Sequence, residues 1–455
     1  MRKIIKEPEP GRKGLQFNPA QVLAISFVSA IAVGTGLLMI PACTVEGHIS
    51  LIDALFTATS AVCVTGLIVQ DTAVYFTPLG QGIILILFQL GGLGIMTFST
   101  LVMLMAGRKI SFKDRIIIQE GFHHASPSNL KSLIRKVFLF TFTLESAGAV
   151  LLFLHWKDNF SGIQAGFHAV FHSVSAFCNA GFARFSDSFE SFRGDLYVNT
   201  VLIILIILGG LGFLVLFELW EIGAAKIKKK QHRFSLHMKM VLSTTLILLI
   251  GAGLLFFILE EGRALQELPA EEKAAAALFQ TVTPRTAGFN TLDMNLLGRG
   301  TLFMLIMLMF VGAAPGSTGG GVKVTTLGVL FAFIKSRLAG RQSVNMGRRT
   351  LPFELITKAF TLLTLSFMVI SASVFILLIS QQGMKVLEII FEVFSAFGTV
   401  GLSLGITPEL NSLGKTVVIL TMYIGRIGPL TFLYAFSRER PLGRYEYVKE
   451  TVMIG

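Results

Sequence analysis

Hydrophobic residues along the chain form long runs, and short polar stretches that each contain a glycine interrupt the pattern at regular intervals. A membrane-spanning helix needs about 20 mostly apolar residues. Eight runs are long enough to span, and we expect these helices at residues 20–40, 79–105, 133–156, 198–220, 238–259, 301–334, 356–379 and 413–436. Four shorter apolar segments cannot cross, and they predict re-entrant helices at residues 51–62, 163–177, 270–282 and 385–397.

The order of these elements predicts an all-α polytopic membrane protein. A long helix, a re-entrant pore helix, a filter loop and a second long helix occur four times, so that eight spans would surround a central pore. The expected parts are a cytoplasmic N-terminus (1–19), repeat 1 (20–106), a basic cytoplasmic loop (107–132), repeat 2 (133–220), a basic cytoplasmic loop (221–237), repeat 3 (238–334), a basic cytoplasmic loop (335–355), repeat 4 (356–436) and a cytoplasmic C-terminus (437–455).

Similar stretches of sequence follow the four short helices. Their glycines, Gly66, Gly181, Gly288 and Gly401, are separated by 115, 107 and 113 residues. Backbone carbonyls can replace the water around a cation, and glycine reaches the φ values that turn consecutive carbonyls toward one axis. The stretches therefore predict an ion selectivity filter, although they could simply be turns. The candidate filter residues are Val64, Thr65, Gly66, Leu67, Asn179, Ala180, Gly181, Phe182, Thr286, Ala287, Gly288, Phe289, Thr399, Val400, Gly401 and Leu402.

The third repeat differs from the others in length. A phenylalanine precedes the glycine by ten residues in three repeats, whereas Phe279 precedes Gly288 by nine. We therefore expect the third repeat to be one residue shorter, either in its short helix or in the bend that follows. The four loops need not have equal geometry.

A glycine-rich segment interrupts the run at 301–334. Residues 312–321 contain five glycines and a proline, which cannot maintain a helix. We expect two half-helices joined by an intramembrane gating loop formed by Gly312, Ala313, Ala314, Pro315, Gly316, Ser317, Thr318, Gly319, Gly320 and Gly321. A nucleotide-binding P-loop is the alternative, but Val322 stands where its lysine should be, and Lys323 comes one residue late.

Arg426 lies within the last apolar run, at the position where repeats 1 and 2 have Gly92 and Gly210. An arginine inside a span is costly and marks a functional site by default. We expect its guanidinium to face a polar interior. A purely structural ion pair is the alternative.

Charge and composition agree with a membrane protein. The 455 residues are 53% hydrophobic and only 15% charged, and the net charge is +12. Five segments, at 1–19, 107–137, 221–240, 335–358 and 437–455, contain 28 of the 39 Lys and Arg residues. Because cytoplasmic loops are rich in these residues, both termini are expected inside the cell, and the glycine loops enter from outside. Orientation accounts for the basic residues better than nucleic-acid binding does.

Three aspartates and three cysteines give weaker signals. Asp71, Asp187 and Asp293 follow three of the filter loops, where they could concentrate cations or be ordinary solvated loop residues. The cysteines Cys43, Cys63 and Cys178 are expected to be small buried residues and not a disulfide or a metal site.

Together, the four glycine loops, the broken third repeat and Arg426 resemble the Ktr/Trk/HKT superfamily of potassium transporters, most closely its bacterial Ktr-type ion-translocating membrane subunit. In that family a serine in the first filter goes with sodium, so Gly66 implies potassium selectivity, with K⁺ held by the carbonyls of the four filter glycines. The resemblance, and not the sequence pattern, also implies that the Arg426 guanidinium faces the pore below the filter, where it could bind the gating loop. It further implies a homodimer in the plasma membrane, a cytosolic ring of nucleotide-binding regulatory subunits, no organic cofactor and no enzymatic activity.

Other functions remain open at this point. The same fold could form a sodium-permeable or weakly selective cation transporter. A secondary transporter of another substrate is a second alternative, which predicts intramembrane carboxylates in each repeat, and the sequence has no such pattern. A membrane enzyme is a third, for which we find no His/Glu metal pattern.

Overall fold

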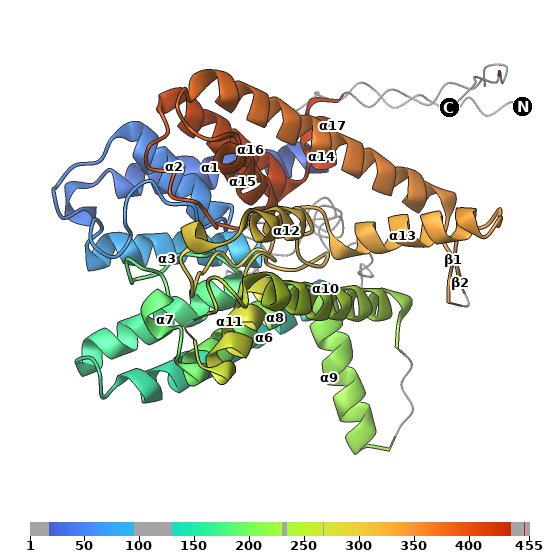
Figure 1. Cartoon of the computed structure of the whole chain (residues 1–455), viewed down its shortest axis with the longest axis horizontal. Helices are drawn as coiled ribbons and strands as arrows, with labels where there is room; N and C mark the ends of the chain where they lie inside the picture. Colours follow the sequence, from blue (N-terminus) through green and yellow to red (C-terminus); the bar gives the residue numbers. More distant parts are fainter. Residues whose placement is uncertain are drawn as a thin grey trace, which may run out of the picture.

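The computed structural model describes residues 18–94, 130–229, 234–266, 268–347, 349–437 and residue 450. These residues are mostly helical (Figure 1). The only strands among them form a small antiparallel hairpin, in which β1 (Asn345–Met346) pairs with β2 (Arg349–Thr350). The all-α class expected from the sequence is therefore confirmed for the described part of the chain.

Four consecutive units of helices follow one another along the chain. Unit 1 has α1 (Pro19–Leu38), η1 (Pro41–Cys43), α2 (Leu51–Val62) and α3 (Pro78–Leu93). Unit 2 has α6 (Leu130–Trp156), α7 (Gly162–Cys178), η3 (Glu190–Phe192), α8 (Leu196–Leu211) and α9 (Phe213–Ile227). Unit 3 has α10 (Leu236–Glu260), α11 (Ala270–Val282), η4 (Met294–Leu296), α12 (Arg299–Phe310) and α13 (Val324–Leu338). Unit 4 has α14 (Phe353–Ser380), α15 (Val386–Gly398), α16 (Ser412–Ile427) and α17 (Pro429–Phe436).

The first helix of each unit is long and apolar enough to cross a membrane. Within the described residues these four helices are α1, α6, α10 and α14, and the number rises to six if the bent pairs α8–α9 and α16–α17 each count as one span. The short helices α2, α7, α11 and α15 lie at the positions expected for re-entrant helices. Eight complete spans therefore remain a prediction.

Two of the expected continuous spans are in fact bent, so this part of the sequence prediction is wrong. The run at 198–220 bends by 104° between α8 and α9, and the run at 413–436 bends by 96° between α16 and α17. A glycine with positive φ, Gly212 or Gly428, stands at each bend (φ 84° and 92°), a conformation that glycine adopts at no steric cost. Gly94 ends α3 with a similar φ of 80°, and the expected residues 95–105 lie outside the described part of the chain.

The run at 301–334 is broken, as its glycine content predicts. Helix α12 ends at Phe310 and α13 begins at Val324. Val311, just after α12, and Val322, just before α13, form a parallel bridge. The loop between the two helices therefore begins and ends at nearly the same place.

Each unit packs against the next, and the last packs against the first. Helix α3 contacts α7, α8 contacts α11, α12 contacts α15, and α16 contacts α2. In each pair, the second long helix of one unit, or its first half in unit 3, lies against the short helix of the following unit. Figure 1 shows the same arrangement, with the blue helices of unit 1 between the red helices of unit 4 and the green helices of unit 2. An ion pair between Lys415 and Asp53 (2.6 Å) also joins units 4 and 1.

Within three units, a glycine brings the second long helix against the backbone of the short helix. A Cβ placed on Gly91, Gly209 or Gly425 would lie 2.1, 1.9 or 2.0 Å from a backbone carbonyl oxygen. The oxygens belong to Val62, Phe177 and Phe397, each four residues before a filter glycine. Small residues let helix backbones approach closely in a membrane, and units 1, 2 and 4 share this contact.

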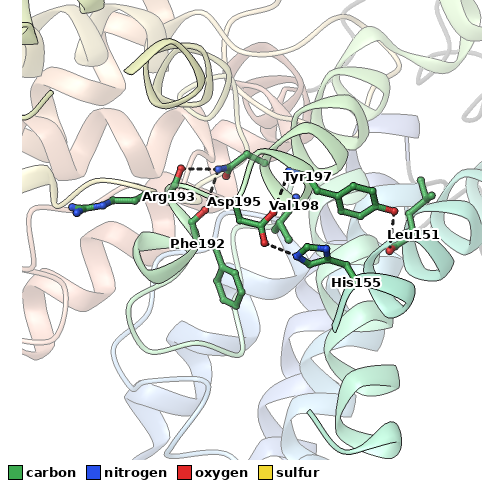
Figure 2. A network of polar contacts seen from close by, with 8 residues as sticks. Leu151, His155, Phe192, Arg193, Asp195, Tyr197 and Val198 are labelled. Atoms are coloured by element: carbon green, nitrogen blue, oxygen red, sulfur yellow. Dashed lines mark hydrogen bonds and ion pairs between the residues drawn. The ribbon is translucent and has the colours of Figure 1, made fainter. Parts of the chain in front are cut away.

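Polar contacts fasten α6 to the start of α8 in unit 2 (Figure 2). The Asp195 carboxylate accepts the N–H groups of Tyr197 and Val198 at the start of α8, and it lies 2.6 Å from His155 Nε2 on α6. The Tyr197 hydroxyl donates to the carbonyl of Leu151 on α6. These bonds fix the N-terminal end of α8 against α6. Helix α8 also packs on α7.

We predict that Gly209→Ala destabilises the protein. Its methyl group has no room against the Phe177 carbonyl, and overpacking of this kind costs about 1–3 kcal/mol. The measurement is the thermal unfolding midpoint of the purified protein in detergent. Gly251→Ala on α10 is the matched control, because nothing lies within 4 Å of its Cβ position; it should unfold at or slightly above the wild-type temperature. An unchanged midpoint for Gly209→Ala would contradict the packing.

Candidate functional site

The four glycines that the sequence singles out lie against one another. Each has its Cα beside the next, in the closed order Gly66, Gly181, Gly288, Gly401 and back to Gly66. A Cβ on any of them would meet the carbonyl oxygen that precedes the next glycine. The separations are 2.6 Å to Ala180 O, 3.1 Å to Ala287 O, 2.4 Å to Val400 O and 2.2 Å to Thr65 O.

The same two positions have positive φ in all four loops. The glycines have φ values of 89°, 72°, 76° and 97°. Two residues earlier, Val64, Asn179, Thr286 and Thr399 also have positive φ, between 49° and 75°. Three of these four residues are β-branched, for which positive φ is strained. Such strain persists only where the surrounding structure enforces it.

A buried hydroxyl group braces each loop from behind, a role that the sequence analysis missed. Ser60 Oγ and Ser395 Oγ accept the N–H groups of Gly66 and Gly401, both at 3.1 Å. Ser175 Oγ donates to the Phe182 carbonyl at 2.8 Å, and Thr283 Oγ1 donates to the Phe289 carbonyl at 2.5 Å. The sequence signal for this role was a serine or threonine four residues after the phenylalanine in each of the four stretches.

These hydroxyl groups also locate the residue that the third unit lacks. In every unit the hydroxyl residue follows the phenylalanine by four positions, and Thr283 follows Phe279 by the same number. Thr283 precedes its glycine by five residues, whereas Ser60, Ser175 and Ser395 precede theirs by six. The missing residue therefore lies in the bend and not in the short helix.

The loops present carbonyl groups to the place where the glycines meet and bury their side chains. All the non-glycine residues predicted for the filter are buried. The apolar side chains after the glycines pack outward, for example Phe182 on Phe88 and Phe289 on Phe189. The short helices end just before the loops, so their partly negative C-terminal ends favour a cation there. This arrangement can replace the hydration of a cation with carbonyl oxygens.

The loop between α12 and α13 lies directly against the filter loops. A Cβ on Gly319 would be 2.1 Å from Thr286 Oγ1, and Gly320 N–H donates to Thr399 Oγ1 at 3.0 Å. Backbone bonds join the loop to unit 2, from Ala314 N–H to Gly210 O (3.0 Å) and from Phe213 N–H to Gly316 O (3.0 Å). The candidate gate Gly312–Gly321 is thus held between units.

Arg426 binds the loop through its guanidinium group. One nitrogen donates to the carbonyl of Thr318 in the loop, and the other donates to the carbonyl of Gly91 on α3. In the residues that the structure describes, Arg426 forms no ion pair with a carboxylate. The alternative of a structural ion pair is therefore not what these contacts show.

Lys323 is a second cation at this loop, and the sequence analysis noted it only as misplaced for a P-loop. Its Nζ donates to the carbonyls of Gly319 (2.6 Å) and Gly320 (3.3 Å). The signal in the sequence was a lysine directly after the glycines inside an expected span. Lys323 and Arg426 therefore both donate hydrogen bonds to carbonyl groups of the loop.

The cysteines and acidic residues have separate outcomes. Cys43, Cys63 and Cys178 are free, and they are buried as expected. Asp187 and Asp293 lie near Glu190, a residue that the sequence analysis did not select. Burial, and then the nearby Asp293 and Asp187 carboxylates, raise the pKa of Glu190 above its usual value, while Asn290 donates to it at 2.6 Å.

All three aspartates accept backbone N–H groups in their own loops. Asp71 accepts from Ala73 (2.8 Å), Asp187 from Ser191 (3.0 Å) and Asp293 from Asn295 (2.9 Å). They therefore act as turn residues, which was the plainer of the two interpretations.

Comparison with known proteins identifies relatives over nearly the whole chain. The family model for TrkH, described as a cation transport protein, matches residues 16–447. Ktr system potassium uptake protein B of Bacillus subtilis (strain 168) is 42% identical, over 94% of each chain. Potassium/sodium uptake protein NtpJ of Enterococcus hirae is 36% identical, over 97% of this chain and 98% of the relative.

A solved structure shows that the fold is shared. The crystal structure of the potassium transporter TrkH from Vibrio parahaemolyticus superposes with a TM-score of 0.74, over 94% of this chain and 86% of that one. The two sequences are only 20% identical. The fold is therefore retained where most side chains differ.

We predict that Glu190→Gln stabilises the protein at neutral pH. Because the folded protein raises the pKa of Glu190, ionisation of this group is less favourable in the folded than in the unfolded state. The cost is present above the raised pKa and disappears as the pH falls toward the ordinary value of 4.5. Glutamine keeps an acceptor for Asn290.

The measurement is the thermal unfolding midpoint as a function of pH. The variant should unfold above the wild type at neutral pH, and the two curves should meet in acid. Glu409→Gln, at an exposed carboxylate, controls for the loss of one negative charge. A constant difference at all pH values would contradict the assignment.

Proposed function

The chain belongs to the TrkH family of cation transport proteins, and from this premise we propose that it is the membrane subunit of a potassium uptake system of the Ktr/Trk type. It is a multi-pass membrane protein and not an enzyme. The observation that carries the proposal is the closed contact of the four glycine loops, whose carbonyls offer a dehydrated cation a set of oxygens. The printed names of the curated relatives, potassium uptake or potassium/sodium uptake, agree with it.

Potassium is the proposed cargo, held by the carbonyls of Gly66, Gly181, Gly288 and Gly401. The support is that all four loops have a glycine with positive φ, so that no side chain disturbs the oxygens. Sodium is the second candidate, because one relative is named a potassium/sodium uptake protein. Relative uptake of the two ions separates these alternatives.

The segment Gly312–Gly321 is proposed as an intramembrane gate. In its support, Gly319 and Gly320 lie against Thr286 and Thr399 of the filter loops, where a cation leaving the filter would have to pass. Arg426 would hold this gate in place through Thr318 and would oppose a cation by its charge. Loop movement is then required for permeation.

Assembly and orientation are proposed on the family relation and on charge. A Ktr system, in the name of the relative, implies a partner subunit. We infer a cytosolic ring of nucleotide-binding subunits that docks on the basic stretches at 221–237 and 335–355, and a homodimer of this chain. The abundance of Lys and Arg in these stretches supports a cytoplasmic location for them and for both termini.

Gly66→Ser should weaken the preference for potassium over sodium. A Cβ at this position lies 2.6 Å from Ala180 O, so the loops must move apart and the oxygens lose their spacing. We expect the ratio of rubidium to sodium uptake to fall by about 10-fold, or roughly 1.4 kcal/mol of discrimination. The measurement is growth rescue and isotope uptake in cells deficient in potassium uptake.

Gly36→Ser on α1 is the matched control, since nothing lies within 4 Å of its Cβ position. An unchanged ratio in well-expressed Gly66→Ser protein would remove the filter assignment. Failure of the wild-type chain to rescue growth at low potassium would remove the transport function itself.

Loosening the gate should raise flux. Deletion of Gly316–Thr318 and Arg426→Ala each remove the bond to the Thr318 carbonyl, so each should increase rubidium uptake into proteoliposomes per folded protein. The double change should give less than the sum, because both act on one contact. Selectivity should persist, since the filter loops are unchanged.

Arg299→Ala, at an exposed position, controls for the loss of a positive charge. Reduced uptake by a well-folded loop deletion would mean that the segment belongs to the conducting path. A lower yield without higher uptake for Arg426→Ala would indicate a structural arginine.

A further inference from the structure

The residues two positions before the filter glycines form a set of their own. Val64, Asn179, Thr286 and Thr399 are all buried, and all have positive φ. Three of them carry a side-chain oxygen, whereas Val64 in unit 1 carries none. Threonine is strained in this conformation and glycine would not be, so the backbone alone does not explain why hydroxyl groups stand here.

Two members of this set, Asn179 and Thr286, have their side chains close together. The Asn179 amide satisfies its hydrogen bonds when its nitrogen faces the carbonyls of Ala176 (2.8 Å) and Ile206 (3.2 Å). The opposite orientation offers only a bond to Thr286 Oγ1 at 3.3 Å. In the better orientation, Asn179 Oδ1 therefore faces the Thr286 hydroxyl, which can donate to it. A cation that took the place of this hydrogen bond would meet two neutral oxygen atoms.

The inner loop occupies these oxygens. Gly320 N–H donates to Thr399 Oγ1 at 3.0 Å, and a Cβ on Gly319 would lie 2.1 Å from Thr286 Oγ1. A lone pair that accepts the Gly320 N–H cannot at the same time coordinate a cation in the same space. Lys323, which follows the loop, and Arg426 of α16 both donate to loop carbonyls, and the Arg426 charge opposes a cation beside the docked loop.

We propose that Asn179 Oδ1, Thr286 Oγ1 and Thr399 Oγ1 form a site for a dehydrated monovalent cation at the loop end of the filter, and that Gly319–Gly320 and the cation occupy it alternately. This inference rests on the proposed function and adds a ligand set and a coupling to it. By linkage, a cation that binds only where the loop has left must favour the undocked loop. Potassium would thus help to open the gate that it passes.

Hydrogen exchange of the loop tests the competition. The full-length protein in detergent is exchanged in potassium chloride and in choline chloride at equal ionic strength, and peptides that cover residues 312–323 are followed by mass spectrometry. Potassium should speed exchange in this segment by several-fold and leave α1 and α10 unchanged. Equal exchange in both salts would overturn the proposal without any variant.

Thr399→Val removes the hydroxyl but keeps the shape of the side chain. The backbone accepts valine, because Val64 has φ 58° at the equivalent position where Thr399 has 49°. The loop of the variant should exchange about 5-fold faster in choline, the effect of one net hydrogen bond, and potassium should add little. Thr399→Ser restores the hydroxyl and should restore protection of the loop.

Thr416→Val on α16, where the exposed threonine bonds only to the carbonyl of Ser412, is the matched control. If Thr399→Val exchanges like this control and keeps the full potassium effect, the site is wrong. Rubidium uptake by wild-type proteoliposomes separates the two levels. Uptake without a potassium effect on the loop overturns this site alone, whereas no uptake at all overturns the proposed transport function.

Discussion

The close approach of four glycines is the constraint on which the rest of the structure depends. A Cβ on any of them would meet a neighbouring carbonyl oxygen at 2.2–3.1 Å, so the loops can surround one axis only without side chains at these positions. The apolar residues that follow the glycines pack on other side chains, as Phe182 does on Phe88 and Phe289 on Phe189, while carbonyl oxygens lie beside the glycines. Backbone atoms and not side chains therefore meet where the four loops touch.

A second layer of close contacts holds the loops in place. Three glycines of the long helices let carbonyl groups of the short helices come into direct contact with the long-helix backbone. Close packing of this kind matters in lipid, where helices gain little hydrophobic energy from association. The buried hydroxyl groups then tie each loop to the short helix before it. Strained φ values at Val64, Thr286 and Thr399 are sustained by this scaffold.

Much of this arrangement follows from the sequence, and the exceptions have physical reasons. Hydrophobic runs located the long and short helices, and the glycine repeats located the loops, because length and backbone freedom are local properties. The bends at Gly212 and Gly428 were missed, since the flanking residues are as apolar as in a straight span. The roles of Ser60 and Lys323 depend on contacts with residues that only the folded chain brings near.

The third unit departs from the contact pattern that the other three units share. In the other units, Gly91, Gly209 and Gly425 press on the short helix of their own unit. At the corresponding place in unit 3, Gly312 presses on the carbonyl of Gly320, within the loop itself, where a Cβ would come to 2.1 Å. The helix is interrupted there, and its freed backbone groups bond to units 2 and 4 instead. One change of contact partners therefore replaces a continuous bracing helix with a loop that is held by units 2 and 4.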